Sequence, residues 1–366
     1  MTRPRKSTPR QKLSPVDAVI LAVDAFRRGK PVAIAGGGGT TLAFAVETLT
    51  AATLRVLQGR TPPRLVLSHA RARTLKIRLY TPDVVALAMP GDMEIARLRA
   101  IADPTDDLAF PLKGPFDAIR DSLPEAYAAA VKLAKLAGLL PAALVRPARG
   151  AVKPATTLKA ADIQTYDDEI VRTLKIVARA RVPLEGAEQT EMVSFRPEDG
   201  GPEHYAIVIG APSTAKPVLM RMHSECFTGD FLGSLKCDCG SQLRGAITAI
   251  AKAGGGVLLY MAQEGRGIGL INKLRAYRLQ DQGFDTVDAN ERVGFESDER
   301  QYGIAARMLQ LLGYKAVRMM TNNPLKISGL KAAGIRVAAR VRHAFPENEH
   351  NRAYLKTKAQ RSGHLL

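Results

Sequence analysis

The chain has 366 residues, of which 46% are hydrophobic, and this suggests two domains with substantial cores. It contains no run of about 18 apolar residues, so no membrane-spanning helix is predicted. A formal net charge of +18 favours a polyanionic partner: nucleic acid, an anionic membrane or a phosphorylated small molecule. With no Trp and 5% aromatic residues, the chain lacks the stacking surface typical of single-strand binding proteins, so we expect a small molecule and no specific nucleic acid.

The first half of the chain predicts a mixed helix-and-strand domain over residues 14–150. Residues 1–13 are basic and contain Pro, Ser and Thr, which is typical of a disordered arm. Residues 14–30 fit a helix capped by Ser14, and a short buried strand follows. The glycine-rich segment 36–41 comes next. It lacks the Lys-Ser/Thr ending of a phosphate-binding loop, so a flexible turn is the favoured interpretation.

The rest of this half adds further elements but no obvious active site. Residues 64–69 and 76–80 predict strands, residues 122–139 predict a helix, and residues 141–145 return as an apolar strand. We interpret segment 151–169, which begins rich in Pro and Ala, as a linker. This half has no cysteine and no convincing acidic cluster.

The second half, residues 170–366, predicts another mixed domain. Apolar segments bounded by turn residues predict strands within 171–184, 191–198, 205–210, 218–225, 255–265, 315–324 and 335–341. Helices are expected over 242–253, 270–282, 299–312 and 325–333. The predicted fold class is therefore α/β (mixed α+β), with two domains that each contain a mixed sheet and flanking helices.

All three cysteines, Cys226, Cys237 and Cys239, lie within 14 residues of sequence. Three clustered thiols cannot form a closed set of disulfides and fit a reducing compartment, so we expect a cytoplasmic location. Their polar surroundings favour a zinc site with three protein ligands and an open fourth position, as in catalytic zinc sites. The alternative is three reduced, buried cysteines. Three interpretations of His223 stay open: a fourth zinc ligand, a contact to the substrate, or a histidine packed in the core.

Three other segments place polar residues near predicted strand ends or helix starts. The glycine-rich segment 263–269 follows a strand and precedes a helix, which suits an anion at the helix N-terminus. Segment 297–300 contains three consecutive charges. Segment 321–324 is a polar loop, and Lys326 soon after it suits a phosphate. Each segment alone is also compatible with an ordinary solvated loop.

Taken together, RMHSECFTGDFLGSLKCDCG, QEGRGIGL, FESDER and TNNPLK resemble the GTP cyclohydrolase II family, from about residue 172 to the C-terminus. The C-x10-C-x-C spacing is the one that the family has. The resemblance implies hydrolysis of GTP to 2,5-diamino-6-(ribosylamino)pyrimidin-4-one 5′-phosphate, formate and pyrophosphate, at the start of riboflavin synthesis. It also implies Zn²⁺, Mg²⁺ and a homodimer.

The resemblance further implies a role for each matching position. The implied zinc ligands are Cys226, Cys237 and Cys239. The implied catalytic residues are Asp298 as proton acceptor, Arg300 as nucleophile toward the α-phosphate and Tyr277 beside the reacting ring. The implied GTP contacts are Arg221, Met222, His223, Ser224, Glu225, Gln242, Glu264, Gly265, Arg266, Thr286, Thr321 and Lys326.

Chemistry refines two of these roles. A guanidinium keeps its protons and is a poor nucleophile, so we expect Arg300 to stabilise charge on the α-phosphate instead. A carboxylate such as Glu264 suits the N1–H and 2-amino edge of guanine, which adenine does not offer in the same pattern. Two alternatives stay open. One is a homologue that stops at an incomplete product, against which the intact Tyr277 and Asp298 argue. The other is a zinc-containing nucleic-acid-binding regulator, which would show steep salt dependence.

The N-terminal half resembles 3,4-dihydroxy-2-butanone-4-phosphate synthase through AVDAFRRGKPVAIA and LAMPGDMEIARLRAIADP. It departs from that family at 36–41, where the family has an acidic run that binds magnesium and substrate. It departs again at 113–117, where the family's histidine is absent. Because hard cations require oxygen ligands, we expect this domain to be catalytically inactive and to serve packing or dimerisation.

Overall fold

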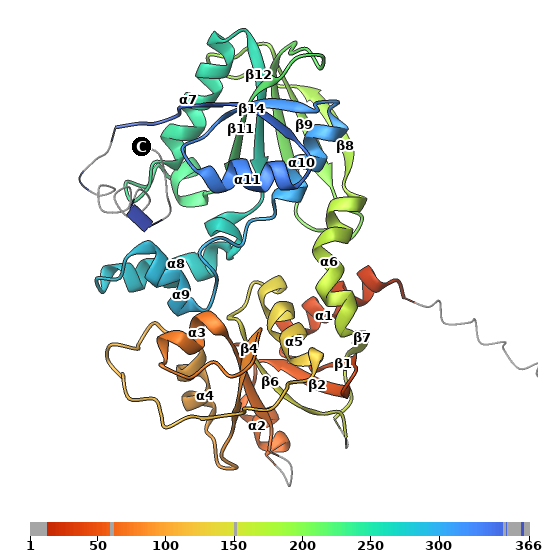
Figure 1. The fold of residues 1–366 in the computed structure, drawn as a ribbon, viewed down its shortest axis with the longest axis vertical. Coiled ribbons are helices and arrows are strands. Elements are labelled where there is room, and N and C mark those ends of the chain that lie inside the picture. Colours follow the sequence, from red (N-terminus) through yellow and green to blue (C-terminus); the bar gives the residue numbers. More distant parts are fainter. Residues whose placement is uncertain (1–12, 59–61, 150–151, 347–348, 350–359, 362–366) are drawn as a thin grey trace, which may run out of the picture.

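The computed structural model describes residues 13–58, 62–149, 152–346, 349 and 360–361. These residues form two seven-stranded mixed sheets, one from each half of the chain, with helices around them (Figure 1). The predicted fold class is thereby confirmed. The predicted arm, except for Leu13, lies outside the described residues. Among the described residues, no helix is long and apolar enough to span a membrane.

The N-terminal sheet has the strand order β5-β4-β3-β6-β2-β1-β7 and is antiparallel except for the parallel pair β1·β7. Its strands are β1 (Val32–Gly36), β2 (Gly39–Ala45), β3 (Arg64–Ser68), β4 (Val84–Ala88), β5 (Asp117–Ala118), β6 (Ala142–Pro147) and β7 (Thr156–Lys159). Its helices are α1 (Pro15–Arg27), α2 (Ala51–Leu57), α3 (His69–Thr74), α4 (Ile95–Ala102) and α5 (Glu125–Leu136).

Local sequence explains how this domain begins. Ser14 caps α1 as predicted, because its hydroxyl accepts a hydrogen bond from the Asp17 backbone N–H at 3.1 Å. The glycine-rich segment 36–41 is a hairpin: Gly36 pairs with Gly39, whose φ of 98° suits a residue without a side chain, and β2 starts there.

The predicted strand at 76–80 is wrong. Lys76 lies at φ 60°, a left-handed conformation that interrupts extended pairing, and the strand forms later as β4. The β-branched and apolar residues near 77–79 therefore lie in an irregular connection between α3 and β4.

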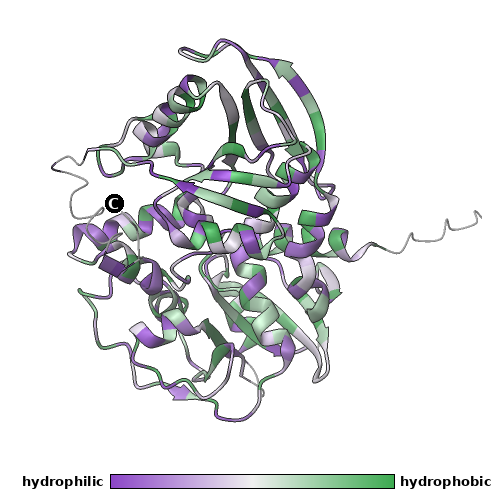
Figure 2. Ribbon diagram, turned by 45° about the horizontal axis from the view of Figure 1, so that its top comes forward, coloured by the Kyte–Doolittle hydropathy of each residue, from purple (hydrophilic) through white to green (hydrophobic). Residues whose placement is uncertain are grey.

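Alternation along the strands of the N-terminal sheet builds a core on each face. Val32 and Ile34 pack with α1, α5 and α6, whereas Leu42 and Phe44 pack with α2, α3 and α4 on the other face. Figure 2 shows hydrophobic residues, coloured green, on the central strands of both sheets.

The C-terminal sheet has the order β14-β13-β11-β12-β10-β9-β8. Strands β14, β13, β11 and β12 are parallel neighbours, and β12, β10, β9 and β8 pair antiparallel. The strands are β8 (Lys175–Arg181), β9 (Thr190–Arg196), β10 (His204–Gly210), β11 (Val218–Ser224), β12 (Gly255–Met261), β13 (Ala316–Met320) and β14 (Arg336–Val341). The helices are α6 (Ala160–Thr173), α7 (Cys239–Lys252), α8 (Gly269–Asp281), α9 (Thr286–Val293), α10 (Tyr302–Leu311) and α11 (Pro324–Ala332).

The segment 151–169, which we predicted to be a linker, contains β7 and most of α6. The Pro-rich composition ends at Pro154, and β7 then pairs with β1. In α6, Ile163 packs in the N-terminal core and Ile170 in the C-terminal core. The connection between the sheets is therefore a helix with apolar contacts to both domains (Figure 1).

Helices α8 and α9 lie between the two sheets (Figure 1). Their residues Leu279 and Val293 belong to the same apolar cluster as Leu65 and Leu67 of the N-terminal sheet. The two domains therefore share a continuous core at this point. Helix α9 was missing from the sequence prediction, because its eight residues, TVDANERV, contain few apolar positions.

Candidate active site

The site lies where three neighbouring parallel strands end. The chain after β11 leads to Cys226, the chain after β12 leads to Glu264, and Thr321 directly follows β13. In sheets with parallel strands, ligands bind beyond the carboxyl ends of the strands. One pocket is lined by residues from all three of these loops and from α7, α8 and α9.

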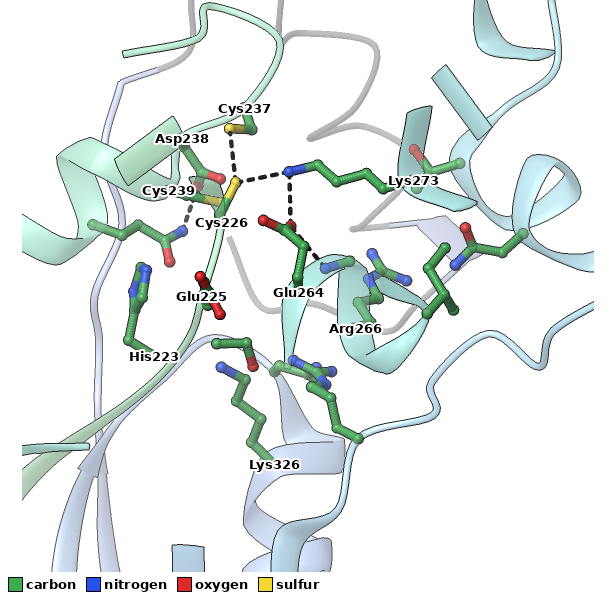
Figure 3. Close-up of a pocket in the computed structure, with 18 of the residues that line it drawn as sticks. His223, Glu225, Cys226, Cys237, Asp238, Cys239, Glu264, Arg266, Lys273 and Lys326 are labelled. Atoms are coloured by element: carbon green, nitrogen blue, oxygen red, sulfur yellow. Dashed lines mark hydrogen bonds and ion pairs between the residues drawn. The ribbon is translucent and has the colours of Figure 1, made fainter. Parts of the chain in front are cut away.

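The three cysteines converge in this pocket (Figure 3). Their sulfur atoms all lie within 4.8 Å of one another, and Cys226 Sγ is 3.8 Å from Cys237 Sγ. Tetrahedral zinc with Zn–S bonds of about 2.3 Å requires sulfur atoms about 3.8 Å apart. The donor set and its spacing therefore fit a zinc ion, and this cluster is the one group of potential ligands found among the described residues.

Gly229 makes the convergence possible. It lies in the π-helical turn Phe227–Phe231, which packs on the thiols. A Cβ atom at this position would lie 2.6 Å from Cys237 Sγ and 3.1 Å from Cys226 Sγ. Any side chain at Gly229 would therefore displace two of the three sulfur atoms.

Charge is shared unequally among the thiols. Hydrogen bonds from Cys237 and Cys239 hold the pKa of the Cys226 thiol far below its ordinary value. The same hydrogen bond to Cys226 raises the pKa of Cys237 to about 11, and the pKa of Cys239 is raised as well. One negative charge is therefore already stabilised at Cys226, the form in which a thiol binds a metal.

Lys273 of α8 is the main cation beside this charge. Its Nζ donates to Cys226 Sγ at 3.1 Å, to Glu264 Oε1 at 2.9 Å and to Thr228 Oγ1 at 2.9 Å. Burial disfavours the ammonium, but the Cys226 and Glu264 charges raise the pKa of Lys273 above its ordinary value. Lys273 therefore links the thiol cluster to the loop after β12 (Figure 3).

His223 is not part of the thiol cluster. Its Nε2 lies 3.0 Å from both carboxylate oxygens of Asp230, and its ring stacks on Tyr260 with centroids 5.6 Å apart. Burial lowers the pKa of His223 despite the Asp230 carboxylate. Among the three interpretations that the sequence left open, these contacts favour a pocket residue whose ring is held by Asp230.

Two glutamates face the pocket with different contacts. Both carboxylate oxygens of Glu264 accept hydrogen bonds within the protein. Its Oε2 accepts from the Phe227 backbone N–H at 2.6 Å, and its Oε1 accepts from Lys273. Glu225 accepts no side-chain hydrogen bond from the described residues. Burial and the nearby Glu264 carboxylate raise the pKa of Glu225.

The loop after β12 has an unusual backbone. Gly265 and Arg266 both lie in the left-handed region, at φ 63° and φ 64°, in the short 3-10 turn Glu264–Gly267. A non-glycine residue in this conformation is strained, and such residues concentrate at functional sites. The conformation places Arg266 on the pocket wall, where its Nη1 donates to Ser297 O at 3.2 Å.

Further cations complete the pocket. The guanidinium of Arg221 is buried, donates to Met320 O at 2.9 Å and also to the Gln242 side chain, and burial lowers its pKa to about 10. Lys326 Nζ donates to Met222 O at 2.8 Å. Together with Arg266 they give the pocket lining three positive charges, a basic wall of the kind that favours binding of a polyphosphate.

Arg300 is held by its neighbour. Its Nε and Nη2 donate to the two oxygens of Asp298, at 2.7 and 2.5 Å. Burial alone would raise the pKa of Asp298, but the hydrogen bonds and charge of Arg300 hold this pKa below its ordinary value. The Tyr302 hydroxyl also donates to Asp298, at 2.7 Å. The pair therefore stays ionised, with Arg300 on the pocket wall.

The structure brings nearly all predicted site residues together. The predicted residues that line the pocket are Arg221, His223, Ser224, Glu225, Cys226, Cys237, Cys239, Gln242, Glu264, Gly265, Arg266, Tyr277, Thr286, Arg300, Thr321 and Lys326. Two do not line it. The Met222 side chain packs in the core below the pocket and offers its carbonyl oxygen, and Asp298 lies behind Arg300.

The sequence analysis missed several residues that line the pocket, among them Lys273, Asp238 and His343. Lys273 precedes Tyr277 by four positions, a spacing that places both on one face of a helix and was an available signal. Asp238, between two cysteines, accepts from the Gln242 side chain. His343 comes from the chain after β14, and only the tertiary structure places it beside Gln242 O, at 2.9 Å.

Both a family model and individual known proteins match this chain. The family model for GTP cyclohydrolase II matches residues 175–342. A GTP cyclohydrolase-2 of Azospirillum brasilense is 50% identical over 380 aligned residues, which cover 99% of both chains. This chain belongs to the GTP cyclohydrolase II family. The family identified by resemblance is confirmed, and with it the assignment as an enzyme.

Two shorter sequence matches and one solved structure are also similar to this chain. A GTP cyclohydrolase-2 of Azotobacter vinelandii is 54% identical over 52% of this chain and 91% of its own length. The riboflavin biosynthesis protein RibBA of Bacillus cereus is 57% identical over 45% of this chain and 41% of its own. A solved two-domain 3,4-dihydroxy-2-butanone 4-phosphate synthase from A. baumannii, RibBX, covers 88% of this chain and 99% of its own, at 16% identity and a TM-score of 0.30.

Proposed function

We propose that this family member hydrolyses GTP to 2,5-diamino-6-(ribosylamino)pyrimidin-4-one 5′-phosphate, formate and pyrophosphate. The reaction would use Zn²⁺ held by Cys226, Cys237 and Cys239, and Mg²⁺ with the triphosphate. The observation that carries the proposal is the convergence of three thiols within 4.8 Å in a pocket that also contains a basic wall.

Cys226, Cys237 and Cys239 would hold the zinc ion, which would supply activated water at neutral pH for attack on C8 of guanine. The protein's own residues prepare that site. Lys273 donates to Cys226 Sγ and so offsets part of the negative charge of three thiolates. Burial raises the pKa of Tyr277 to about 12, so its hydroxyl keeps a proton to donate to the opening ring.

The basic wall suits the triphosphate. Arg221, Arg266 and Lys326 line one continuous pocket with the thiols, and their charges favour a magnesium–triphosphate complex there. Each is anchored by a backbone carbonyl, at Met320, Ser297 and Met222 respectively. Anchored cations lose little conformational freedom when the substrate binds.

Recognition of guanine needs a carboxylate for N1–H and the 2-amino group. Glu264, expected in this role from sequence, already accepts hydrogen bonds from Phe227 and Lys273. Glu225 lines the same pocket and accepts no side-chain hydrogen bond from the described part of the chain. We assign recognition of the N1–H and 2-amino edge of guanine to Glu225 and Glu264, with Glu225 making the direct contact.

Arg300 in our proposal stabilises charge on the α-phosphate. A guanidinium bonded at two nitrogens to an ionised carboxylate stays protonated and cannot act as a nucleophile. Asp298 keeps Arg300 oriented and is ionised at neutral pH. A phosphorylated arginine trapped at residue 300 during turnover would contradict this role.

The test is an incubation of zinc-replete protein with GTP and Mg²⁺, following formate, pyrophosphate and the pyrimidine product together. We expect all three in equal amounts, and loss of formate with loss of zinc in Cys237→Ser. Pyrophosphate without formate would indicate an enzyme that stops early. Absence of turnover combined with steeply salt-dependent duplex binding would favour the regulator alternative.

For the N-terminal domain we propose no catalytic activity. The segment 36–41, where the family has an acidic run, is a glycine hairpin here, and the carboxylate that approaches it is Glu125, whose Oε2 would lie 3.5 Å from a Cβ at Gly36. One carboxylate is a poor site for Mg²⁺. Conversion of ribulose 5-phosphate to formate and the butanone phosphate by the purified protein would contradict this proposal.

We also propose a cytoplasmic homodimer. The loop between the first and second cysteine exposes several large apolar side chains beside the pocket, including Phe231, Leu232 and Leu235, at 78%, 61% and 57% exposure. Such a cluster favours contact with a second protein surface. Light scattering should give twice the 39.4 kDa chain mass, and Phe231→Ser should shift the mass toward the monomer.

A further inference from the structure

The segment from Glu296 to Arg300 lies at the boundary between the domains, with side chains directed to different sides. Arg300 lines the GTP pocket, whereas Glu299 lines the cavity between α5, α6 and the C-terminal domain. Asp298 is bonded to Arg300. Glu299 therefore faces the N-terminal domain although both of its neighbours belong to the proposed catalytic machinery.

Lys135 of α5 reaches Glu299 from the N-terminal domain. Its Nζ donates to Glu299 Oε1 at 2.5 Å, and the two side chains are 25% and 22% exposed. The same ammonium lies 5.6 Å from the centroid of the Phe295 ring, a favourable cation–π distance. The first contact falls on the segment that carries Arg300, and the second falls on Phe295, the residue directly before that segment.

The backbone of Glu299 is fixed from the opposite side. Its N–H donates to Arg266 O at 3.1 Å, and a Cβ at Gly267 would lie 2.7 Å from Glu299 O. The loop after β12 therefore approaches Glu299 as closely as glycine allows. Glu299 connects this GTP-pocket loop, through its backbone, to the N-terminal domain, through its carboxylate.

We propose that Lys135 is a positioning residue for GTP opening: by holding Glu299, it sets the places of Asp298 and Arg300 at the pocket. This inference rests on the roles of Asp298 and Arg300 in the proposed function. It gives the N-terminal domain a part in the reaction that needs no chemistry of its own, because the domain supplies one ammonium group to the segment that carries Arg300.

The expected effect is on turnover more than on substrate binding. Small displacements of a catalytic group reduce rates strongly, on the order of 10–100-fold for about 1 Å. The thiol cluster, Arg221 and Lys326 line the pocket, whereas Lys135 does not, so we expect them to bind GTP when Lys135 is replaced. Lys135→Met should therefore lower kcat for formate release by about 10-fold or more and change KM for GTP by less than about threefold.

The experiment uses the full-length, zinc-loaded protein with GTP and Mg²⁺. It compares the unchanged enzyme with Lys135→Met, Lys135→Arg, Glu299→Gln and the double variant Lys135→Met/Glu299→Gln. Arg28→Met is the matched control, because it removes from the same domain an exposed ion pair with Asp24 that does not involve the segment from Glu296 to Arg300. Zinc content and thermal midpoint are measured for each protein.

Three results support the inference: Lys135→Arg restores most of kcat, the double variant is no slower than the slower single variant, and Arg28→Met is unchanged. Such non-additivity is expected only when two residues act through each other. Equal kcat for Lys135→Met and the unchanged enzyme, or additive losses, would overturn it. If the unchanged enzyme releases no formate, the proposed function itself fails. Hydrogen exchange over residues 295–301 then tests whether Lys135 positions this segment: faster exchange in Lys135→Met supports positioning, and equal exchange overturns it.

Discussion

Single residues in this protein are often set by what lies next to them in space. Gly229 is the sharpest case, because its missing side chain is the space that the sulfur atoms of Cys226 and Cys237 occupy. Lys273 is another, since its three hydrogen bonds join the thiol of Cys226 and the hydroxyl of Thr228 to the carboxylate of Glu264, which comes from a different loop. At this scale the site depends on close packing as much as on reactive groups.

We expect Gly229→Ala to lose bound zinc. The new methyl group would lie 2.6 Å from Cys237 Sγ, so at least one thiol must leave the cluster. Zinc per folded chain, measured by atomic emission after dialysis, should fall well below that of the unchanged protein, together with formate release. Gly91→Ala is the control, because a Cβ there meets nothing within 4 Å. A Gly229→Ala protein with full zinc content would contradict the packing argument.

Elements are held to one another by a few buried charges. Arg71 of α3 is 1% exposed, and its two terminal nitrogens donate to Asp107 at 2.5 and 2.9 Å. Lys113 bonds the same carboxylate, and Arg292 of α9 lies 3.7 Å from it. Asp107 thus joins α3, the segment after α4 and a helix of the C-terminal domain.

We expect Asp107→Asn to reduce the free energy of unfolding by about 3 kcal/mol, because it leaves the buried Arg71 guanidinium without a counter-charge. Urea unfolding followed by circular dichroism measures this change. Asp24→Asn, which removes an exposed pair with Arg28, should change it by about 0.5 kcal/mol or less. A loss at Asp107 no larger than that of the control would show that the cluster contributes little.

The whole molecule responds to pH through buried histidines. Burial lowers the pKa of His204 to about 4 and that of His343 to about 4, from an ordinary value of 6.5. His204 is neutral in the fold because its Nδ1 accepts from the Ala262 backbone N–H at 3.0 Å. Between pH 6.5 and 4 the unfolded chain binds protons at these sites and the folded chain does not, so acid favours unfolding.

The thermal midpoint should therefore be highest above about pH 6.5 and fall as the pH is lowered towards 4. Differential scanning calorimetry across this range measures the change. His204→Asn keeps an acceptor for Ala262 and removes one titrating group, so its midpoint should fall less steeply over the same interval. An unchanged slope in this variant would mean that His204 does not contribute.

The sequence by itself determined the chemistry that this protein carries. The C-x10-C-x-C spacing, the glycine-rich segment at 263–269 and the TNNPLK motif indicated the family, and apolar segments bounded by turn residues indicated two domains with mixed sheets. These features are local, and short-range sterics and periodicity are sufficient to specify them.

Only the tertiary structure decided how these local features meet. It placed α8 and α9 against the N-terminal sheet, Lys273 beside Cys226, His343 beside Gln242 and Lys135 beside Glu299. The last pair is 164 residues apart in sequence. Contacts of this kind depend on how complete elements pack, and no local pattern of residues encodes which distant side chain will arrive. The physical reason is that apolar burial selects the packing of whole faces, and the polar contacts follow from it.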